Sequence, residues 1–191
     1  MVIDNTMYNA IKKHLPSVNT VCIPNPVDTS DLPAPIEAKG KEVMFLGWVV
    51  KTKGIEELLT AWATVYEKHN DWSLTIAGPY KEDYFVYLKN SFSQRGVTFI
   101  GEKNHNEAME ILNKSEVFVL PSYTEGFPNV IAEAMALKKP IIATGVGAIP
   151  DMLSGNCGLV IPPKNSEAVK AELLKLIENP QLRKELSDNA Y

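Results

Sequence analysis

Short apolar runs alternate along most of the chain with segments whose apolar residues recur every three or four positions. The first amphipathic segment places Ile55, Leu58, Leu59 and Trp62 on one helical face. Short apolar runs that end at glycine, proline or a polar residue predict strands buried on both faces. Such runs lie at 43–46, 72–77, 97–100, 117–120, 140–143 and 158–161.

The segments between these runs predict helices at 82–93, 105–114, 128–138 and 149–154. A further helix is expected after Ser166, and Asn179-Pro180 is a start signal for a last one. This alternation predicts an α/β fold, a Rossmann-like open parallel sheet with helices on both faces. Ligands of such sheets bind beyond the carboxyl ends of the strands, so the residues after each strand are the candidates for a site.

The first residues have a different pattern. Residues 1–20 carry Met7, Ile11 and Leu15 at helical spacing, which predicts one helix. A connector follows that proline makes extended and irregular, and it reads as a linker or a domain entrance. Its prolines are Pro24, Pro26, Pro33 and Pro35.

Charge and cysteine content narrow the class of protein. The 191 residues include 19 Lys and Arg against 23 Asp and Glu, a net charge of −4, which argues against a nucleic-acid partner. Cys22 and Cys157 are too few for a disulfide framework, and two packed thiols indicate a reducing compartment. The start of the chain lacks the pattern of a signal peptide, so a cytoplasmic location is expected.

The segment from Pro121 to Ala136 carries the most chemistry. Gly126 permits a tight turn, and Pro128 suits the first turn of a helix whose N-terminus is an anion site. Asn129 and Glu133 share one face of that helix, and Glu125 precedes it. These carboxylates could hold sugar hydroxyls beside a phosphate. They could equally favour the helix dipole on a solvated face, and the residues alone leave both interpretations open.

A second candidate is the turn after the first strand, which holds Gly47, Trp48, Lys51 and Lys53. Two lysines at a strand-to-helix turn suit a diphosphate, although solvated loop lysines are the commoner case. The histidines His14, His69 and His105 are scattered, and we expect surface or loop positions rather than metal ligation. His105 follows a strand end closely enough to be a candidate for the site.

These motifs resemble the C-terminal, donor-binding domain of GT-B glycosyltransferases of family 4, the glycosyl transferases group 1. Glu125 and Glu133 have the spacing of the family's Glu-x7-Glu motif, within Glu125-Gly126-Phe127 and Glu133-Ala134-Met135-Ala136. The turn from Phe45 to Gly54, the segment Asn25-Pro26-Val27-Asp28 and the turn Gly147-Ala148-Ile149-Pro150-Asp151 resemble three further family segments. The resemblance covers roughly residues 21–178.

The resemblance implies retaining, metal-independent transfer of a sugar from a nucleotide donor, with no cofactor and no metal. The resemblance implies that Glu133 binds the ribose hydroxyls, that Glu125 contacts the donor sugar and that Lys53 neutralises the diphosphate. Backbone N–H groups in the segment Gly126–Val130 would bind the phosphate and the sugar. The base would lie near the 101–106 loop. Lys53 and Glu125 are thus the catalytic candidates. The donor-binding candidates are Gly47, Trp48, Lys51, Lys53, Glu125, Gly126, Phe127, Pro128, Asn129, Val130 and Glu133.

The resemblance also implies a second, acceptor-binding domain in the parent protein. Residues 1–36 would then be the tail of that preceding domain and the interdomain connector, and 37–191 the Rossmann-like nucleotide-sugar-binding domain. The parent could associate peripherally with a membrane. We expect the chain alone to bind a nucleoside diphosphate without transferring sugar.

Three positions depart from the family pattern: Trp48 stands in place of Arg, and Pro26 and Ala148 stand in place of Gly. Trp48 cannot neutralise a phosphate, so either Lys51 supplies that charge, which we favour, or nothing does. Trp48 also supports the competing hypothesis of a noncatalytic nucleotide-sugar-binding module, whereas Lys53, Glu125 and Glu133 favour an enzyme.

Overall fold

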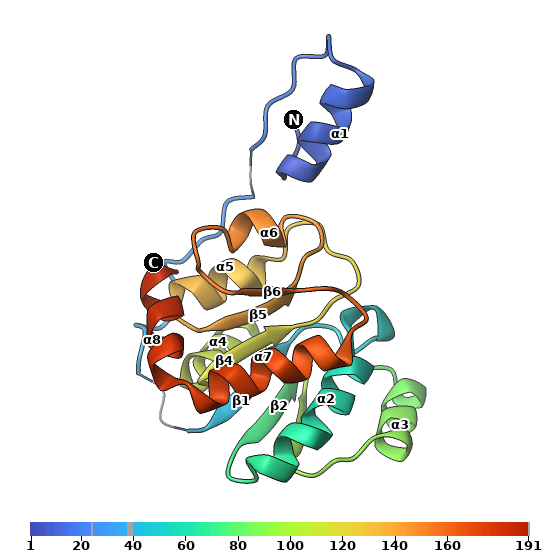
Figure 1. Ribbon diagram of the computed structural model, residues 1–191, viewed down its shortest axis with the longest axis vertical. Coiled ribbons are helices and arrows are strands. Elements are labelled where there is room, and N and C mark those ends of the chain that lie inside the picture. Colours follow the sequence, from blue (N-terminus) through green and yellow to red (C-terminus); the bar gives the residue numbers. More distant parts are fainter. Residues whose placement is uncertain (24, 38–39, 191) are drawn as a thin grey trace.

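The computed structural model describes residues 1–23, 25–37 and 40–190. Within them, six strands form one parallel sheet in the order β3-β2-β1-β4-β5-β6 (Figure 1). All six predicted strands are confirmed. Their bounds are β1 (Glu42–Leu46), β2 (Ser73–Ala77), β3 (Val97–Gly101), β4 (Val117–Leu120), β5 (Ile141–Thr144) and β6 (Leu159–Ile161).

Helices cover both faces of the sheet, which confirms the predicted fold class. Right-handed crossovers put the helices after β1 and β2 on one face and those after β3, β4 and β5 on the other. On the first face α2 packs along α7, and on the second α4 contacts β1 and α5. The helices are α1 (Asn5–His14), α2 (Ile55–Lys68), α3 (Glu82–Ser91), α4 (His105–Lys114), α5 (Asn129–Ala136), α6 (Ile149–Met152), α7 (Ser166–Glu178) and α8 (Pro180–Asn189).

Two local features differ from the prediction. The helices expected at 128–138 and 149–154 are shorter, because Lys138 and Gly155 adopt positive φ just beyond them. A short 3-10 helix, η1 (Lys51–Lys53), was not predicted, because three residues carry no periodicity. None of the described helices is long and apolar enough to cross a membrane.

Three neighbouring strands, β1, β4 and β5, form the centre of the core. Every residue of β4 and β5 is buried, as is Val43–Phe45 within β1. Strands enclosed by helices on both faces cannot alternate apolar and polar residues, which explains the continuous apolar runs of the sequence. The core therefore fixes β1 beside β4, where the strand order reverses.

The N-terminal helix predicted from Met7, Ile11 and Leu15 is present as α1, which stands away from the sheet in Figure 1. It touches the rest of the chain at α6, where the backbone N–H of Asn5 donates to Asp151 Oδ2 at 2.8 Å. The domain boundary at residues 36 and 37 stays a prediction, and Pro24 and residues 38–39 lie outside the described residues.

The end of the connector is tied to the sheet domain by two buried side chains. Asn113 accepts from the N–H of Ile36 at 3.2 Å and donates to the carbonyl of Ala34 at 2.8 Å. Lys139 Nζ donates to the carbonyl of Ile36 at 3.2 Å, and burial lowers the pKa of Lys139 to about 8. The sequence predicted an irregular linker here and gave no sign of these contacts.

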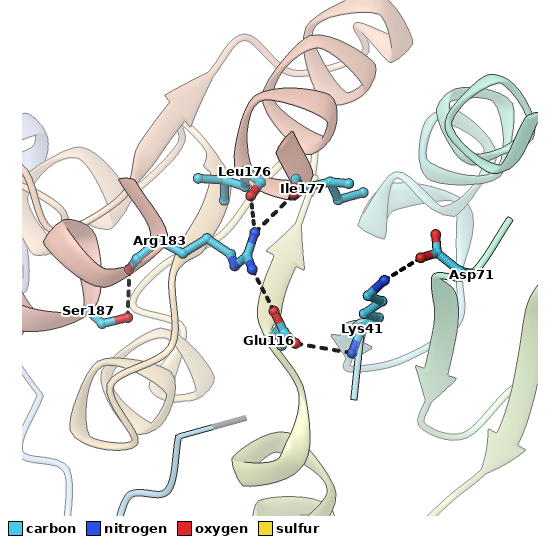
Figure 2. Close-up of polar contacts among 7 residues, drawn as sticks. All are labelled: Lys41, Asp71, Glu116, Leu176, Ile177, Arg183 and Ser187. Carbon is cyan, nitrogen blue, oxygen red and sulfur yellow. Dashed lines mark hydrogen bonds and ion pairs between the residues drawn. The ribbon is translucent and has the colours of Figure 1, made fainter. Parts of the chain in front are cut away.

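An ionic cluster joins α7, α8 and the starts of β1 and β4 (Figure 2). It lies where the parallel strands begin, a side of the sheet that we call the amino edge; the side where the strands end is the carboxyl edge. Arg183 Nη2 lies 2.9 Å from Glu116 Oε2, and its Nη1 donates to two carbonyls at the end of α7. Glu116 also accepts from the N–H of Lys41 at 3.2 Å, and the Lys41 side chain pairs with Asp71. These contacts tie the two C-terminal helices to the amino edge, where Glu116 and Arg183 also line a cavity of about 540 Å³. The opposite edge carries the candidate site.

Candidate functional site

A cavity of about 450 Å³ lies at the carboxyl ends of β1 and β4, where the strand order reverses. This reversal is where open α/β sheets bind their ligands, and the volume suits a small molecule. Its walls come from three strand-to-helix loops and from α4 and α5. The lining residues are Leu46, Gly47, Trp48, Lys53, Lys103, His105, Ala108, Met109, Leu120, Glu125, Pro128, Asn129, Val130 and Glu133.

The loop after β1 presents Trp48 at the rim of the cavity. The N–H of Gly47 donates to Ala77 at 3.0 Å, and that of Val49 donates to Pro79 at 2.9 Å, which holds the loop against the one after β2. Val49 is buried, whereas Trp48 between them is 63% exposed. An aromatic side chain this exposed on a firmly held loop is available for contact with a ligand or another surface.

Lys53 and Glu125 form an ion pair across the cavity. Lys53 Nζ lies 2.6 Å from Glu125 Oε1, and the hydroxyl of Ser122 donates to the same oxygen at 2.6 Å. The side chains are 25% and 10% exposed, so solvent screens this pair less than a surface one. A lysine has three donors, so Lys53 can keep Glu125 and still donate to an anion.

The loop that carries Glu125 is braced from both neighbouring loops. The N–H of Tyr123 donates to Thr52 at 2.8 Å, and its hydroxyl donates to Glu57 Oε1 at 2.6 Å. Burial, and then the hydrogen bond to Glu57, raises the pKa of Tyr123, so this phenol stays a neutral donor. On the other side Thr144 donates to the carbonyl of Ser122.

Two glycines let these loops touch backbone to backbone. Gly54 has φ +72, and a Cβ atom there would lie 2.0 Å from the carbonyl oxygen of Pro121. Gly147 has φ +56, and a Cβ atom there would lie 2.2 Å from the carbonyl oxygen of Glu125. Only glycine fits these approaches, which set the position of Glu125 relative to Lys53.

The second carboxylate lies on α5. Glu133 Oε1 is 2.9 Å from His105 Nε2, which comes from the first residue of α4. The Glu133 side chain is 13% exposed, and that of His105 is 53% exposed. Pro128 caps α5 without a side-chain hydrogen bond, so the first backbone N–H groups of this helix can serve an anion.

The structure brings most of the predicted site residues together. Gly47, Trp48, Lys53, Glu125, Pro128, Asn129, Val130 and Glu133 line the cavity. Lys51, Gly126 and Phe127 do not line it. Lys51 Nζ lies 3.6 Å from Glu56 Oε2 and its side chain is 67% exposed, while the carbonyl of Gly126 accepts from Ala148 at 2.9 Å.

Six lining residues were absent from the set predicted for the site: Leu46, Lys103, His105, Ala108, Met109 and Leu120. Two sequence signals pointed to this part of the cavity: the 101–106 loop was expected near the base, and His105 follows a strand end. His105 lies on the surface, as expected. The four apolar residues look like core positions in the sequence, and nothing marks them as a cavity floor. Among the described residues no group of three His, Cys, Asp or Glu side chains is placed to hold a metal ion.

Residues 29–191 match the model of a family described as glycosyl transferases group 1. The chain belongs to this family. The resemblance found in the motifs is thereby confirmed. Among its relatives, a capsular polysaccharide biosynthesis glycosyltransferase, CapM of Staphylococcus aureus, is 29% identical over 153 residues, which cover 76% of this chain and 39% of CapM. The chain therefore spans about two fifths of such a relative.

Solved structures place the fold in the same group. The C-terminal domain of LpcC, a glycosyl transferase group 1 protein of Francisella tularensis, superposes with a TM-score of 0.76 at 26% identity, covering 87% of this chain and 95% of that domain. HepE of Anabaena, solved in complex with UDP and glucose, shares the fold with a TM-score of 0.70 at 20% identity over 79% of this chain and 42% of HepE. This chain thus has the fold of a GT-B C-terminal domain.

We expect Gly147→Ala to destabilise the protein more than Gly101→Ala. Gly101 has φ +68 with no atom within 4 Å of an added Cβ, so its substitution meets only the left-handed backbone strain of about 1–2 kcal/mol. Gly147→Ala adds the clash with the backbone of Glu125, a further loss of about 1–3 kcal/mol. Urea unfolding of both variants measures the difference, and equal losses would show that the loops do not depend on this contact.

Proposed function

We propose that the chain is the nucleotide-sugar donor-binding domain of a retaining glycosyltransferase, which moves a sugar from a nucleoside diphosphate to an acceptor. The observation that carries this proposal is the meeting of Lys53, Glu125 and Glu133 in one cavity at the strand-order reversal. The family match supports the reaction class, and HepE, solved with UDP and glucose, supports the class of ligand.

The nucleotide end of the donor is assigned to the side of the cavity formed by α4 and α5. Glu133 accepts from the ribose hydroxyls, as the resemblance implies. The apolar floor of Ala108 and Met109, beside Lys103, offers a flat base a place near the loop after β3. This division puts the base and ribose on the face of the sheet that α4 and α5 cover.

The diphosphate is assigned to Lys53 and to the N-terminus of α5. Backbone N–H groups of Asn129 and Val130 and the positive end of the helix dipole attract phosphate oxygens. Lys53 adds a full positive charge from the loop after β1. Stabilising the diphosphate as it departs is the main electrostatic demand of the transfer, and this arrangement meets it with protein groups, in keeping with metal-independent chemistry.

Glu125 is assigned to the donor sugar, between the diphosphate and the acceptor. Its pairing with Lys53 couples the two assignments, because the same lysine that neutralises the leaving group orients the carboxylate. Breakage of the bond between the anomeric carbon and the diphosphate oxygen then happens beside a fixed carboxylate.

The acceptor site is assigned to a second domain of the parent protein. The chain spans about two fifths of relatives such as CapM, a capsular polysaccharide biosynthesis glycosyltransferase. By this likeness we infer a saccharide acceptor. We expect the chain alone to bind the nucleotide without transferring sugar, because the second domain is assigned the role of orienting the acceptor. A cytoplasmic location and peripheral membrane association remain predictions for the parent.

One observation favours a noncatalytic nucleotide-sugar-binding module as a second candidate. Trp48 lines the cavity where the family pattern has an arginine, so the cavity holds one charge fewer for the diphosphate. Such a module would bind the donor, and the parent protein would show no turnover with any acceptor.

A thermal-shift panel of UDP, GDP, ADP and their sugar conjugates tests the proposal. A ligand that binds the folded state raises the apparent melting temperature, by an amount that grows with concentration over Kd. We expect one nucleoside diphosphate to raise it more than the matching nucleoside does. The absence of any shift at millimolar ligand would contradict the assignment of the cavity.

The two glutamates are expected to differ toward a free nucleoside diphosphate. Glu133→Ala should weaken its binding by about 1–3 kcal/mol, the scale of hydrogen bonds to a charged group. Glu125→Ala should leave the affinity unchanged or raise it slightly, because it removes the carboxylate that pairs with Lys53 and frees that ammonium for phosphate. Calorimetry of both variants measures this, and equal losses would refute the division of roles.

Trp48 and Lys51 can be tested together. Since Lys51 pairs with Glu56 outside the cavity, the geometry favours the alternative in which it does not replace the missing arginine. Lys51→Ala should then leave diphosphate affinity unchanged, and Trp48→Arg should tighten it about tenfold, or about 1.4 kcal/mol. A selective loss of diphosphate over nucleoside affinity in Lys51→Ala would restore the compensation hypothesis.

A further inference from the structure

His105 lines the cavity, and neither the sequence motifs nor the family match assigns it a role. Its Nε2 atom lies 2.9 Å from Glu133 Oε1, although 28 residues separate the two in the chain. A carboxylate can only accept hydrogen bonds, so this contact requires a proton on Nε2. The pair bridges the start of α4 to α5 at the wall of the cavity.

The backbone that carries His105 is held by a capping box. Asn104 Oδ1 accepts from the N–H of Glu107 at 2.9 Å, and Glu107 Oε2 accepts from the N–H of Asn104 at 3.2 Å. These two bonds fix the first turn of α4, where His105 is the first residue. The imidazole therefore approaches Glu133 from a rigid support.

Glu133 keeps one carboxylate oxygen for a ligand. Within the described residues Oε1 has one hydrogen-bond partner, His105, and Oε2 has none. A glutamate without a partner samples many rotamers, and ordering it on binding lowers affinity. Hydrogen bonding by His105 restricts the side chain beforehand and turns the second oxygen toward an incoming donor.

We propose that His105 is a positioning residue for ribose recognition, which orients the Glu133 carboxylate so that its remaining lone pairs accept from the two ribose hydroxyls. This inference rests on the proposed function, because it takes Glu133 as the ribose-binding group. It adds a consequence: the domain discriminates ribose from deoxyribose, and His105 contributes to that discrimination. A site built to bond a hydroxyl rejects ligands that lack it.

Calorimetric titration of the 191-residue protein tests this. The probe is whichever of UDP, GDP and ADP binds with the highest affinity, together with its 2′,3′-dideoxy analogue. The variants are His105→Ala, His105→Gln, Glu133→Ala and the double variant His105→Ala/Glu133→Ala. Asn106→Ala is the matched control, an exposed neighbour on α4 that does not line the cavity.

His105→Ala should weaken the ribonucleotide about five- to tenfold, the worth of one hydrogen bond, and change the dideoxy analogue less than twofold. His105→Gln should restore most of the affinity, because its amide nitrogen can reach the position of Nε2. The double variant should bind no more weakly than Glu133→Ala alone, and Asn106→Ala should match the wild type.

Equal effects of His105→Ala on both nucleotides would overturn the proposal, since a purely structural tie between α4 and α5 would not distinguish them. An unchanged ribonucleotide affinity in His105→Ala, with Glu133→Ala weakened, would overturn this inference alone. Failure of the wild type to bind UDP, GDP or ADP would overturn the proposed function and the inference with it.

Discussion

Lys53 and Glu125 come from loops that follow different strands, and their 2.6 Å contact depends on β1 and β4 lying side by side. That adjacency is where the strand order reverses, so the loops diverge above the sheet and leave a cavity between them. Backbone contacts at Gly54 and Gly147 then fix how far apart the loops stand. The chemistry of the site thus depends on the sheet topology and on two positions without side chains.

The two edges of the sheet are built differently. At the amino edge Arg183 pairs with Glu116 and donates to carbonyls, Glu116 accepts from the N–H of Lys41, and the Lys41 side chain pairs with Asp71 (Figure 2). Asn113 and Lys139 hold the connector. At the carboxyl edge the polar groups retain spare capacity: Lys53 has donors left, Glu133 has a second oxygen, and α5 begins without a side-chain cap. Groups with unused hydrogen-bonding capacity around a cavity are what a ligand-binding site needs before its ligand arrives.

The sequence predicted the strands and most helices because both signals are local: continuous apolar runs for the strands and helical periodicity for the helices. The runs at 117–120 and 43–46 needed no tertiary information, and the spacing of Glu125 and Glu133 put both at one strand end. It could not predict the partners of these carboxylates, since Ser122 and Lys53 meet Glu125 only after β1 and β4 pair. The orientation of Lys51 toward Glu56 depends on η1, a turn too short to leave a pattern. The apolar floor at Ala108 and Met109 reads as ordinary core in the sequence.

The central claim is that one cavity, at the reversal of strand order, binds the nucleotide of a sugar donor. The most direct measurement is a titration of the ¹⁵N-labelled protein with UDP, GDP and ADP, followed by amide chemical shifts. The account predicts saturable shifts concentrated in residues 46–54, 101–109 and 120–133, on both sides of β1 and β4. Shifts gathered instead around Glu116, Lys139 and Arg183 at the amino edge, or spread without a focus, would contradict it.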